Sequence, residues 1–133
     1  MEKEGVASVW FGWAESGESI REFLMVRYTE EGDSIPSQFI NDFGIDEYDK
    51  DFTEWTFHKV PTRLVRELLK RHSYSDQIIP KIILRVGETL PEAMNAVILM
   101  HQFEYDGSVA ENSGGPVQMR FAGSVPFDPN VDL

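Results

Sequence analysis

Acidic side chains are concentrated between residues 42 and 54, and they are the first candidates for chemistry in this sequence. The stretch holds six carboxylates: Asp42, Asp46, Glu47, Asp49, Asp51 and Glu54. Neighbouring carboxylates such as Asp49 and Asp51 can act as general acid and base, but a catalytic pair requires an enclosing pocket. A solvated run of charge does not predict such a pocket, so we interpret the stretch as a binding surface. We predict no catalytic residues.

Two kinds of metal site are conceivable for the same side chains. The segment from Asp46 to Asp51 offers the oxygen ligands that Ca²⁺ prefers, but it lacks the glycine and the closing glutamate of a regular calcium-binding loop. The three histidines, His58, His72 and His101, have none of the HxH or HxxxH spacings typical of metal ligands. We therefore predict no metal and no other cofactor. A small metal-binding or hydrolytic enzyme that combines these histidines with carboxylates stays open as an alternative.

Large aromatic side chains alternate with the carboxylates and can anchor the segment to a hydrophobic core. We expect this anchoring role for Phe39, Phe43, Phe52 and Trp55, and contact with a partner mainly for the turn 46–51. Trp13 follows Gly12 at the end of an expected strand, where it is either an interface anchor or a tryptophan at the edge of the core. The predicted partner-binding residues are Asp42, Asp46, Glu47, Tyr48, Asp49, Asp51, Glu54 and Trp13.

Composition limits the classes of function. The 133 residues, 41% of them hydrophobic, suit one folded domain over residues 1–133. The net charge of −11 argues against direct nucleic-acid binding, which draws on clustered Lys and Arg. The sequence has no cysteine for disulfides, no apolar run long enough to span a membrane and no signal peptide at its start. We expect a cytoplasmic protein without membrane contact.

Hydrophobic periodicity and turn residues predict an α+β domain with a mainly antiparallel sheet and helices packed on one side. Strands are expected over residues 5–12, 51–60, 95–105 and 117–121, the last two paired as a hairpin. Helices are expected over residues 19–28, 38–43, 61–72 and 76–86, with Ser37 and Gly44 as the caps of the second. A strand stays open as the alternative for residues 82–86, because isoleucine and valine are β-branched. The segment 123–133 is expected to be a tail that either packs on the body or is mobile.

The helix expected from Pro61 carries basic side chains on one face, and these could neutralise the acidic turn within the molecule. The basic residues are Arg63, Arg66, Lys70 and Arg71. The sequence leaves open whether the turn faces this helix or an external partner.

Several short motifs resemble those of the Immunity protein 22 family, small bacterial proteins that protect a cell from a polymorphic toxin. The motifs are Val9-Trp10-Phe11-Gly12, Asp42-Phe43-Gly44-Ile45 followed by Tyr48-Asp49 and Asp51-Phe52, Ser73-Tyr74-Ser75, and Phe103-Glu104-Tyr105. Together they span most of residues 8–105.

The resemblance implies an α+β fold and a cytosolic inhibitor that binds a cognate toxin domain and has no reaction of its own. The acidity of the chain agrees with a basic partner, a nuclease being one candidate. The hypothesis is therefore a toxin-neutralising protein whose acidic segment covers a basic active-site cleft. A general interaction module without a toxin partner is the second alternative.

Overall fold

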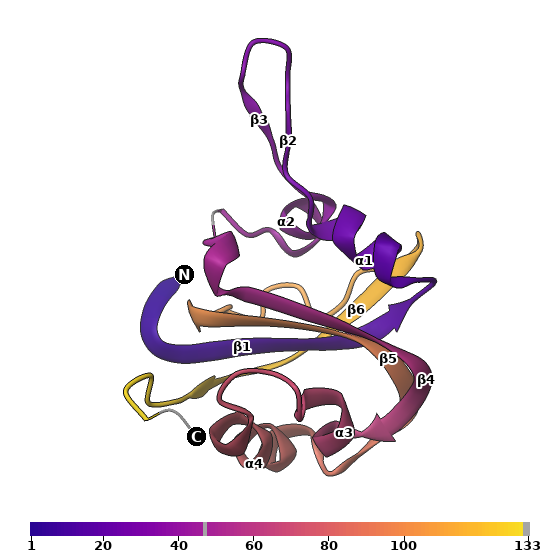
Figure 1. Ribbon diagram of the computed structural model, residues 1–133, viewed down its shortest axis with the longest axis vertical. Coiled ribbons are helices and arrows are strands. Elements are labelled where there is room, and N and C mark those ends of the chain that lie inside the picture. The colour runs from indigo at the N-terminus through magenta and orange to yellow at the C-terminus, as the bar shows by residue number, and fades with distance from the viewer. Residues whose placement is uncertain (47, 132–133) are drawn as a thin grey trace.

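The centre of the molecule is a four-stranded antiparallel sheet, shown in Figure 1 by a computed structural model that describes residues 1–46 and 48–131. The strand order is β4 (Thr53–Leu64), β5 (Thr89–Phe103), β1 (Glu2–Ala14) and β6 (Val117–Pro126). The two central strands, β1 and β5, are buried over most of their length. Their nearly continuous apolar sequences are typical of strands that are covered on both faces.

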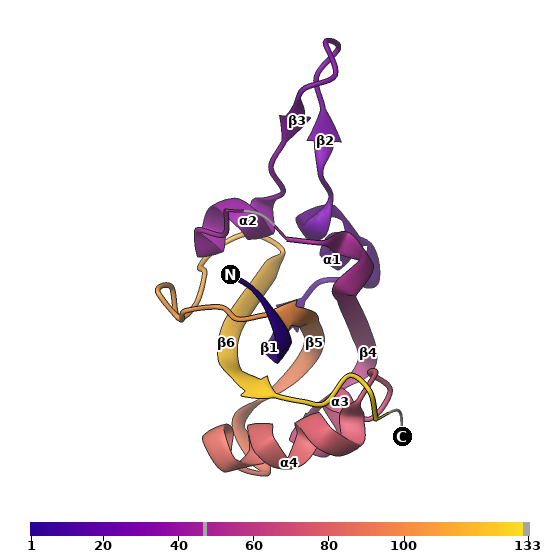
Figure 2. The same ribbon diagram turned by 90° about the vertical axis from the view of Figure 1, so that its left-hand side faces the viewer.

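Helices cover both faces of this sheet, as Figures 1 and 2 show. Helices α1 (Gly17–Leu24) and α2 (Gln38–Phe43) lie over the face that contains Trp10 and Ile98. Helices α3 (Val65–Leu69) and α4 (Ser75–Val86) lie over the face that contains Val9, Val97 and Leu99. The α+β class and the antiparallel sheet are confirmed. The expectation of helices on one side is wrong, because both sets of alternating residues in β1 and β5 are apolar and each face needs a cover.

A two-stranded hairpin of β2 (Arg27–Tyr28) and β3 (Ser34–Ile35) projects from the body (Figure 1). The helix expected over residues 19–28 is shorter than predicted, since it begins at Gly17 after the N-cap Ser16 and ends at Leu24. Ile20 and Phe23 are the residues of this helix that are buried against the core. The following residues have no core to pack on, so the chain leaves the body as an extended strand.

The strand expected over residues 51–60 is longer than predicted. A single turn of 3₁₀-helix, η1 (Lys50–Phe52), precedes β4, which continues through Pro61 to Leu64. The expected helix therefore does not begin at Pro61 but at Val65, and it ends at Leu69. Pro61 is tolerated because β4 is an edge strand and its pairing with β5 is irregular between Phe57 and Thr62.

Strand β6 pairs with β1, so the expected hairpin between β5 and the last strand is wrong. Both edges of β5 are already occupied, one by β4 and the other by β1. The chain after Phe103 crosses to the free edge of β1 through a long loop. Gly12 permits this pairing, since a Cβ atom there would lie 2.0 Å from the carbonyl oxygen of Gln118.

The segment 123–133 begins inside β6, which runs to Pro126. Beyond the strand, Phe127 is buried and the chain lies against α4, where the backbone N–H of Asp128 donates to Gln77 Oε1 at 2.7 Å. Helix α4 forms as expected with Pro80 inside it. Helix α2 also has its expected caps, because the Ser37 hydroxyl accepts from the Ile40 N–H and Gly44 adopts φ 64°. None of the helices in the described part combines the length and apolarity needed to cross a membrane.

Candidate functional site

The acidic loop, residues 46–52, connects α2 to β4 at the end of the sheet where β1 begins (Figure 1). Its flanks are held by apolar contacts. Ile45 is buried, and Tyr48 is half-buried with its ring 6.0 Å from that of Phe39. The Tyr48 hydroxyl also donates to the carbonyl oxygen of Leu24 at 3.2 Å. Glu47, one of the predicted partner-binding residues, lies outside the described residues.

The three described carboxylates of the acidic loop are exposed, but they differ in their contacts. Asp49 is the N-cap of η1, because its Oδ1 accepts from the Asp51 N–H at 2.8 Å. In the part of the chain that the structure describes, neither Asp46 nor Asp51 forms an ion pair through its side chain. Asp46 and Asp51 therefore remain available for a partner, while Asp49 also shapes the loop.

The basic residues 63, 66, 70 and 71 do not neutralise the acidic loop within the described part of the molecule. Lys70 instead pairs with Glu67 on its own helix, and the Arg63 guanidinium donates to the carbonyl oxygen of Leu90. The loop and α3 also lie on opposite faces of the sheet (Figures 1 and 2). The described residues of the loop therefore do not pair with the basic helix, and contact with an external partner stays a prediction.

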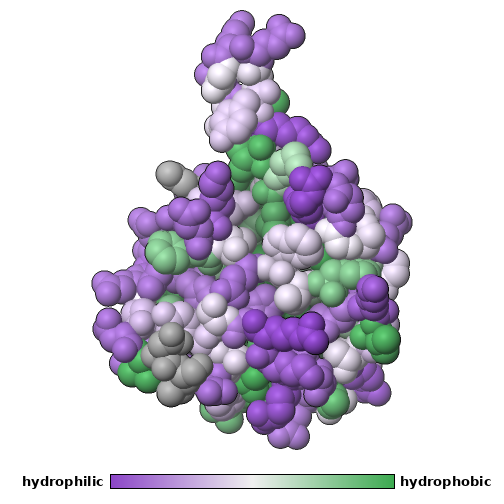
Figure 3. Space-filling model, viewed as in Figure 1, coloured by the Kyte–Doolittle hydropathy of each residue, from purple (hydrophilic) through white to green (hydrophobic). Residues whose placement is uncertain are grey.

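A groove of about 1060 Å³ lies beside the acidic loop. Its lining comes from the acidic loop and the N-terminal residues, from the chain between Leu24 and Tyr28, from Ser34, Pro36 and Ile40, and from the end of β5 between Met100 and Phe103. Figure 3 shows hydrophobic side chains at the surface where the hairpin joins the body. The groove therefore combines apolar side chains with carboxylates that include Asp46 and Asp49.

Asp42 has a different environment from the acidic loop. It is half-buried on α2, and its two carboxylate oxygens accept from the side-chain amides of Gln38 at 2.6 Å and Asn112 at 2.8 Å. Asn112 in turn accepts from the Met119 N–H. These bonds hold the loop after β5 against α2, so Asp42 has a structural role that the sequence did not reveal.

Glu54 is also turned toward the protein. Its Oε1 lies 2.9 Å from His72 Nδ1 and accepts from the Ser73 N–H at 3.1 Å, and its Oε2 accepts from the Ser73 hydroxyl. Burial by itself would raise the pKa of Glu54, but the hydrogen bonds from His72 and Ser73 outweigh it and lower the pKa to about 2. The carboxylate links β4 to the segment between α3 and α4.

Two histidines meet at this carboxylate, as the enzyme alternative requires. His101 Nδ1 lies 4.0 Å from Glu54 Oε2, and burial lowers the pKa of His101 although the Glu54 charge opposes that shift. His72 Nε2 lies 2.9 Å from Thr56 Oγ1, which gives the order hydroxyl, imidazole and carboxylate of a catalytic triad.

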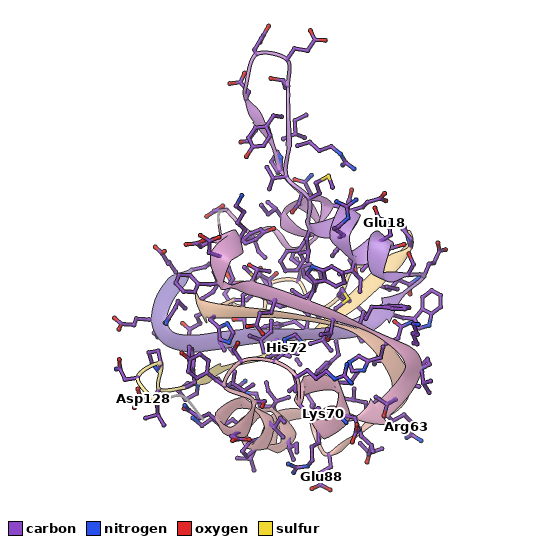
Figure 4. The ribbon with its side chains drawn as sticks, in the orientation of Figure 1. Glu18, Arg63, Lys70, His72, Glu88 and Asp128 are labelled. Carbon is purple, nitrogen blue, oxygen red and sulfur yellow. The ribbon has the colours of Figure 1, made fainter. Side chains whose placement is uncertain are left out.

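The imidazole of this triad-like order is shielded, because the His72 side chain is only 1% exposed and neither His72 nor Thr56 lines the groove. His101, on the other side of the Glu54 carboxylate, does line the groove. Figure 4 shows His72 between β4 and the layer of α3 and α4. Across residues 1–46 and 48–131, no group of three His, Asp or Glu side chains is placed to hold a metal ion. The arrangement therefore works as a latch between β4 and the chain before α4.

The sequence model of the Immunity protein 22 family matches residues 7–128, which include nearly all of the sheet, the hairpin and the acidic loop. The chain belongs to the Immunity protein 22 family. Searches of curated proteins and of solved structures find no match.

The remaining predicted partner-binding residue, Trp13, is 47% exposed but distant from the acidic loop. It lies near the end of β1 and lines a smaller groove of about 270 Å³, to which no described residue of the acidic loop contributes. In this Immunity protein 22 chain, Phe52 and Trp55 are 43% and 38% exposed, so the expected anchoring role is wrong for them and correct for the fully buried Phe39 and Phe43.

The hairpin of this family member was missed in the sequence, although it contributes to the lining of the groove. The sequence signal was the polar turn 29–33 between Val26, Tyr28 and Ile35, which alternate as in a strand. The pattern overlaps the end of the helical pattern over residues 19–28, so the sequence favours a longer helix in place of the hairpin.

Proposed function

We propose that this protein is an immunity protein that binds and neutralises a cognate bacterial toxin domain through its acidic loop. Family membership supports an immunity role in general. The observation that carries the finer proposal is that Asp46 and Asp51 are exposed, form no ion pair within the described residues, and belong to a loop that lines a groove with several apolar side chains. A basic toxin domain complements such a surface, and a nuclease that binds phosphates is one such domain.

Neutralisation in this proposal requires only binding. The exposed carboxylates attract the basic cleft of the toxin and raise the rate of encounter, while exposed apolar side chains such as Phe52 hold the complex by removing their surface from water. The toxin's active site is then covered, and the immunity protein performs no reaction of its own. We place this encounter in the cytoplasm, without membrane or direct nucleic-acid contact.

Protection of growing cells tests the proposal. Toxin domains encoded in the genome of the source organism are expressed one at a time in a susceptible host, with and without the immunity protein. We expect the wild type to restore growth against at least one domain. The double variant Asp46→Lys/Asp51→Lys should lose most of this protection, whereas Asp49 is left unchanged because it caps η1.

The control carries the same charge change elsewhere on the surface. Glu15 and Glu88 are exposed, and Figure 4 shows Glu88 at the end of the molecule opposite the hairpin. The double variant Glu15→Lys/Glu88→Lys should protect as well as the wild type, with circular dichroism showing that both variants are folded. Equal protection by the two double variants would refute the role of the acidic loop, and no protection by the wild type would favour an interaction module without a toxin partner.

A further inference from the structure

The hairpin and the acidic loop both contribute residues to the lining of the groove. We infer that they form the two walls of a clamp for one segment of the toxin domain, in which Lys or Arg residues flank an apolar or aromatic side chain. This inference rests on the proposed function and adds the site and the chemistry of the bound segment.

The hairpin exposes apolar side chains that contribute nothing to the hydrophobic core. Tyr28 is 68% exposed, Ile35 44% and Val26 36%. The hairpin has only two paired residues in each strand and stands clear of the body in both ribbon views (Figures 1 and 2). A two-stranded hairpin is marginally stable alone, and exposed aromatic and branched side chains are frequent anchors in interfaces. Val26 and Tyr28 line the groove, so a segment bound there would cover them and fix the hairpin.

Negative charge in the groove selects a basic segment. Asp46, Asp49 and Glu2 line the groove, and Lys50 is the one Lys or Arg among the described lining residues. The turn of the hairpin, beyond the groove lining, holds three more exposed carboxylates, Glu30, Glu31 and Asp33, against the exposed Arg27 of β2. A Lys or Arg beside an apolar anchor would meet the carboxylates of the groove, whereas an acidic segment would be repelled by them.

The groove is large enough for a polypeptide segment, since its volume of about 1060 Å³ lies at the upper end, about 1,000 Å³, of the range for small-molecule pockets. Met25 and Met100 line the groove, and methionine side chains adapt their shape to what they contact. Gln102 lines the groove with φ 57°, and its Oε1 accepts from the Gly5 N–H at 2.6 Å. This irregular pairing turns the N-terminal residues toward the groove, where Met1 and Glu2 lie.

Isothermal titration calorimetry with the purified toxin domain against which the wild type protects tests the clamp. The variant Val26→Ser/Tyr28→Ser, which changes the two apolar residues of β2 and its approach that line the groove, should bind about 30-fold more weakly or worse, as is usual when central apolar anchors are removed. The control Val60→Ser/Leu84→Ser removes apolar side chains that are 80% and 87% exposed elsewhere, and it should change the affinity by less than about twofold. Circular dichroism must show that both variants have the wild-type spectrum.

A photocrosslinker in place of Tyr28 gives a second readout that does not depend on weakened binding. We expect it to label a toxin peptide that contains Lys or Arg beside an apolar residue, while the same crosslinker in place of Leu84 labels none. If the wild type binds the toxin domain and both hairpin tests show no effect, the clamp is refuted and the proposed function stands. If the wild type protects against none of the domains tested, the proposed function fails and the clamp fails with it.

Discussion

Replacing Glu54 with Gln should remove a part of the protein's stability that depends on pH. The Glu54 carboxylate accepts hydrogen bonds from His72 and Ser73, and its pKa lies near 2 instead of at the ordinary 4.5. A carboxylate with a lowered pKa in the folded state stabilises the protein above its unfolded-state pKa. That contribution is lost as the pH falls from about 4.5 toward 2. The glutamine side chain of the variant has no proton to gain and cannot show this loss.

The size of the effect follows from the two pKa values. A difference of 2.5 units, from 4.5 to about 2, corresponds to about 3.4 kcal/mol when both states are fully protonated. Between pH 7 and pH 3 the linkage relation gives a loss of about 2 kcal/mol. Since the Glu54 side chain is 32% exposed, solvent screening reduces this figure to about 1 kcal/mol.

Urea denaturation at pH 7 and at pH 3 measures this difference. We expect Glu54→Gln to be less stable than the wild type by about 2 kcal/mol at pH 7, because bonds to a charged acceptor are lost, and by about 1 kcal/mol at pH 3. The exposed Glu88→Gln is the control and should cost the same at both pH values. If Glu54→Gln lowers the free energy of unfolding by the same amount at both pH values, the ionised carboxylate is not what stabilises the contact between β4 and the chain before α4.

Three further substitutions test how the sheet is built, each by thermal or urea denaturation. Gly12→Ala should destabilise by about 3 kcal/mol, since its Cβ would meet the Gln118 carbonyl oxygen, and a wild-type midpoint would disprove the close approach of β1 and β6. Gly17→Ala should stabilise by about 0.5 kcal/mol, because the new methyl lies at ordinary contact distance, 3.6 Å from Phe57, and the unfolded chain loses freedom. Asn95→Ala should cost about 3 kcal/mol, since the buried amide bonds both backbone groups of Ala14 at 2.8 and 2.9 Å, and a cost below about 1 kcal/mol would contradict this.

The sequence predicted the ends of an element correctly where those ends depend on residues close by in the chain. Ser37 and Gly44 bound α2 as expected, because capping is a contact within one turn of the chain. Pro61 misled the prediction of the next helix, since its effect depends on whether the strand is at a sheet edge. The pairing of β6 with β1 could not be read locally either, because it depends on which strand edges are already occupied.

In the candidate site, too, the role of a side chain depends on residues that are distant in the sequence. Six carboxylates in one stretch look equivalent in the sequence, but Asp42 meets Asn112 and Glu54 meets His72, both distant along the chain. Asp46 and Asp51 form no ion pair among the described residues, and their contact with a partner stays a proposal. The hairpin was missed because its apolar residues are exposed, and hydrophobic patterns are interpreted as core.

The association rate of the immunity protein with its toxin domain, measured by stopped-flow fluorescence at low and at 150 mM salt, tests the central claim most directly. Asp46→Lys/Asp51→Lys changes the charge of the loop by four units, each worth about 0.5 kcal/mol in water at about 8 Å from a partner cation. We expect the variant to associate about 30-fold more slowly at low salt and about fourfold more slowly at 150 mM salt, where the Debye length is about 8 Å. Rates equal to those of the wild type at both salt concentrations would contradict binding through the acidic loop.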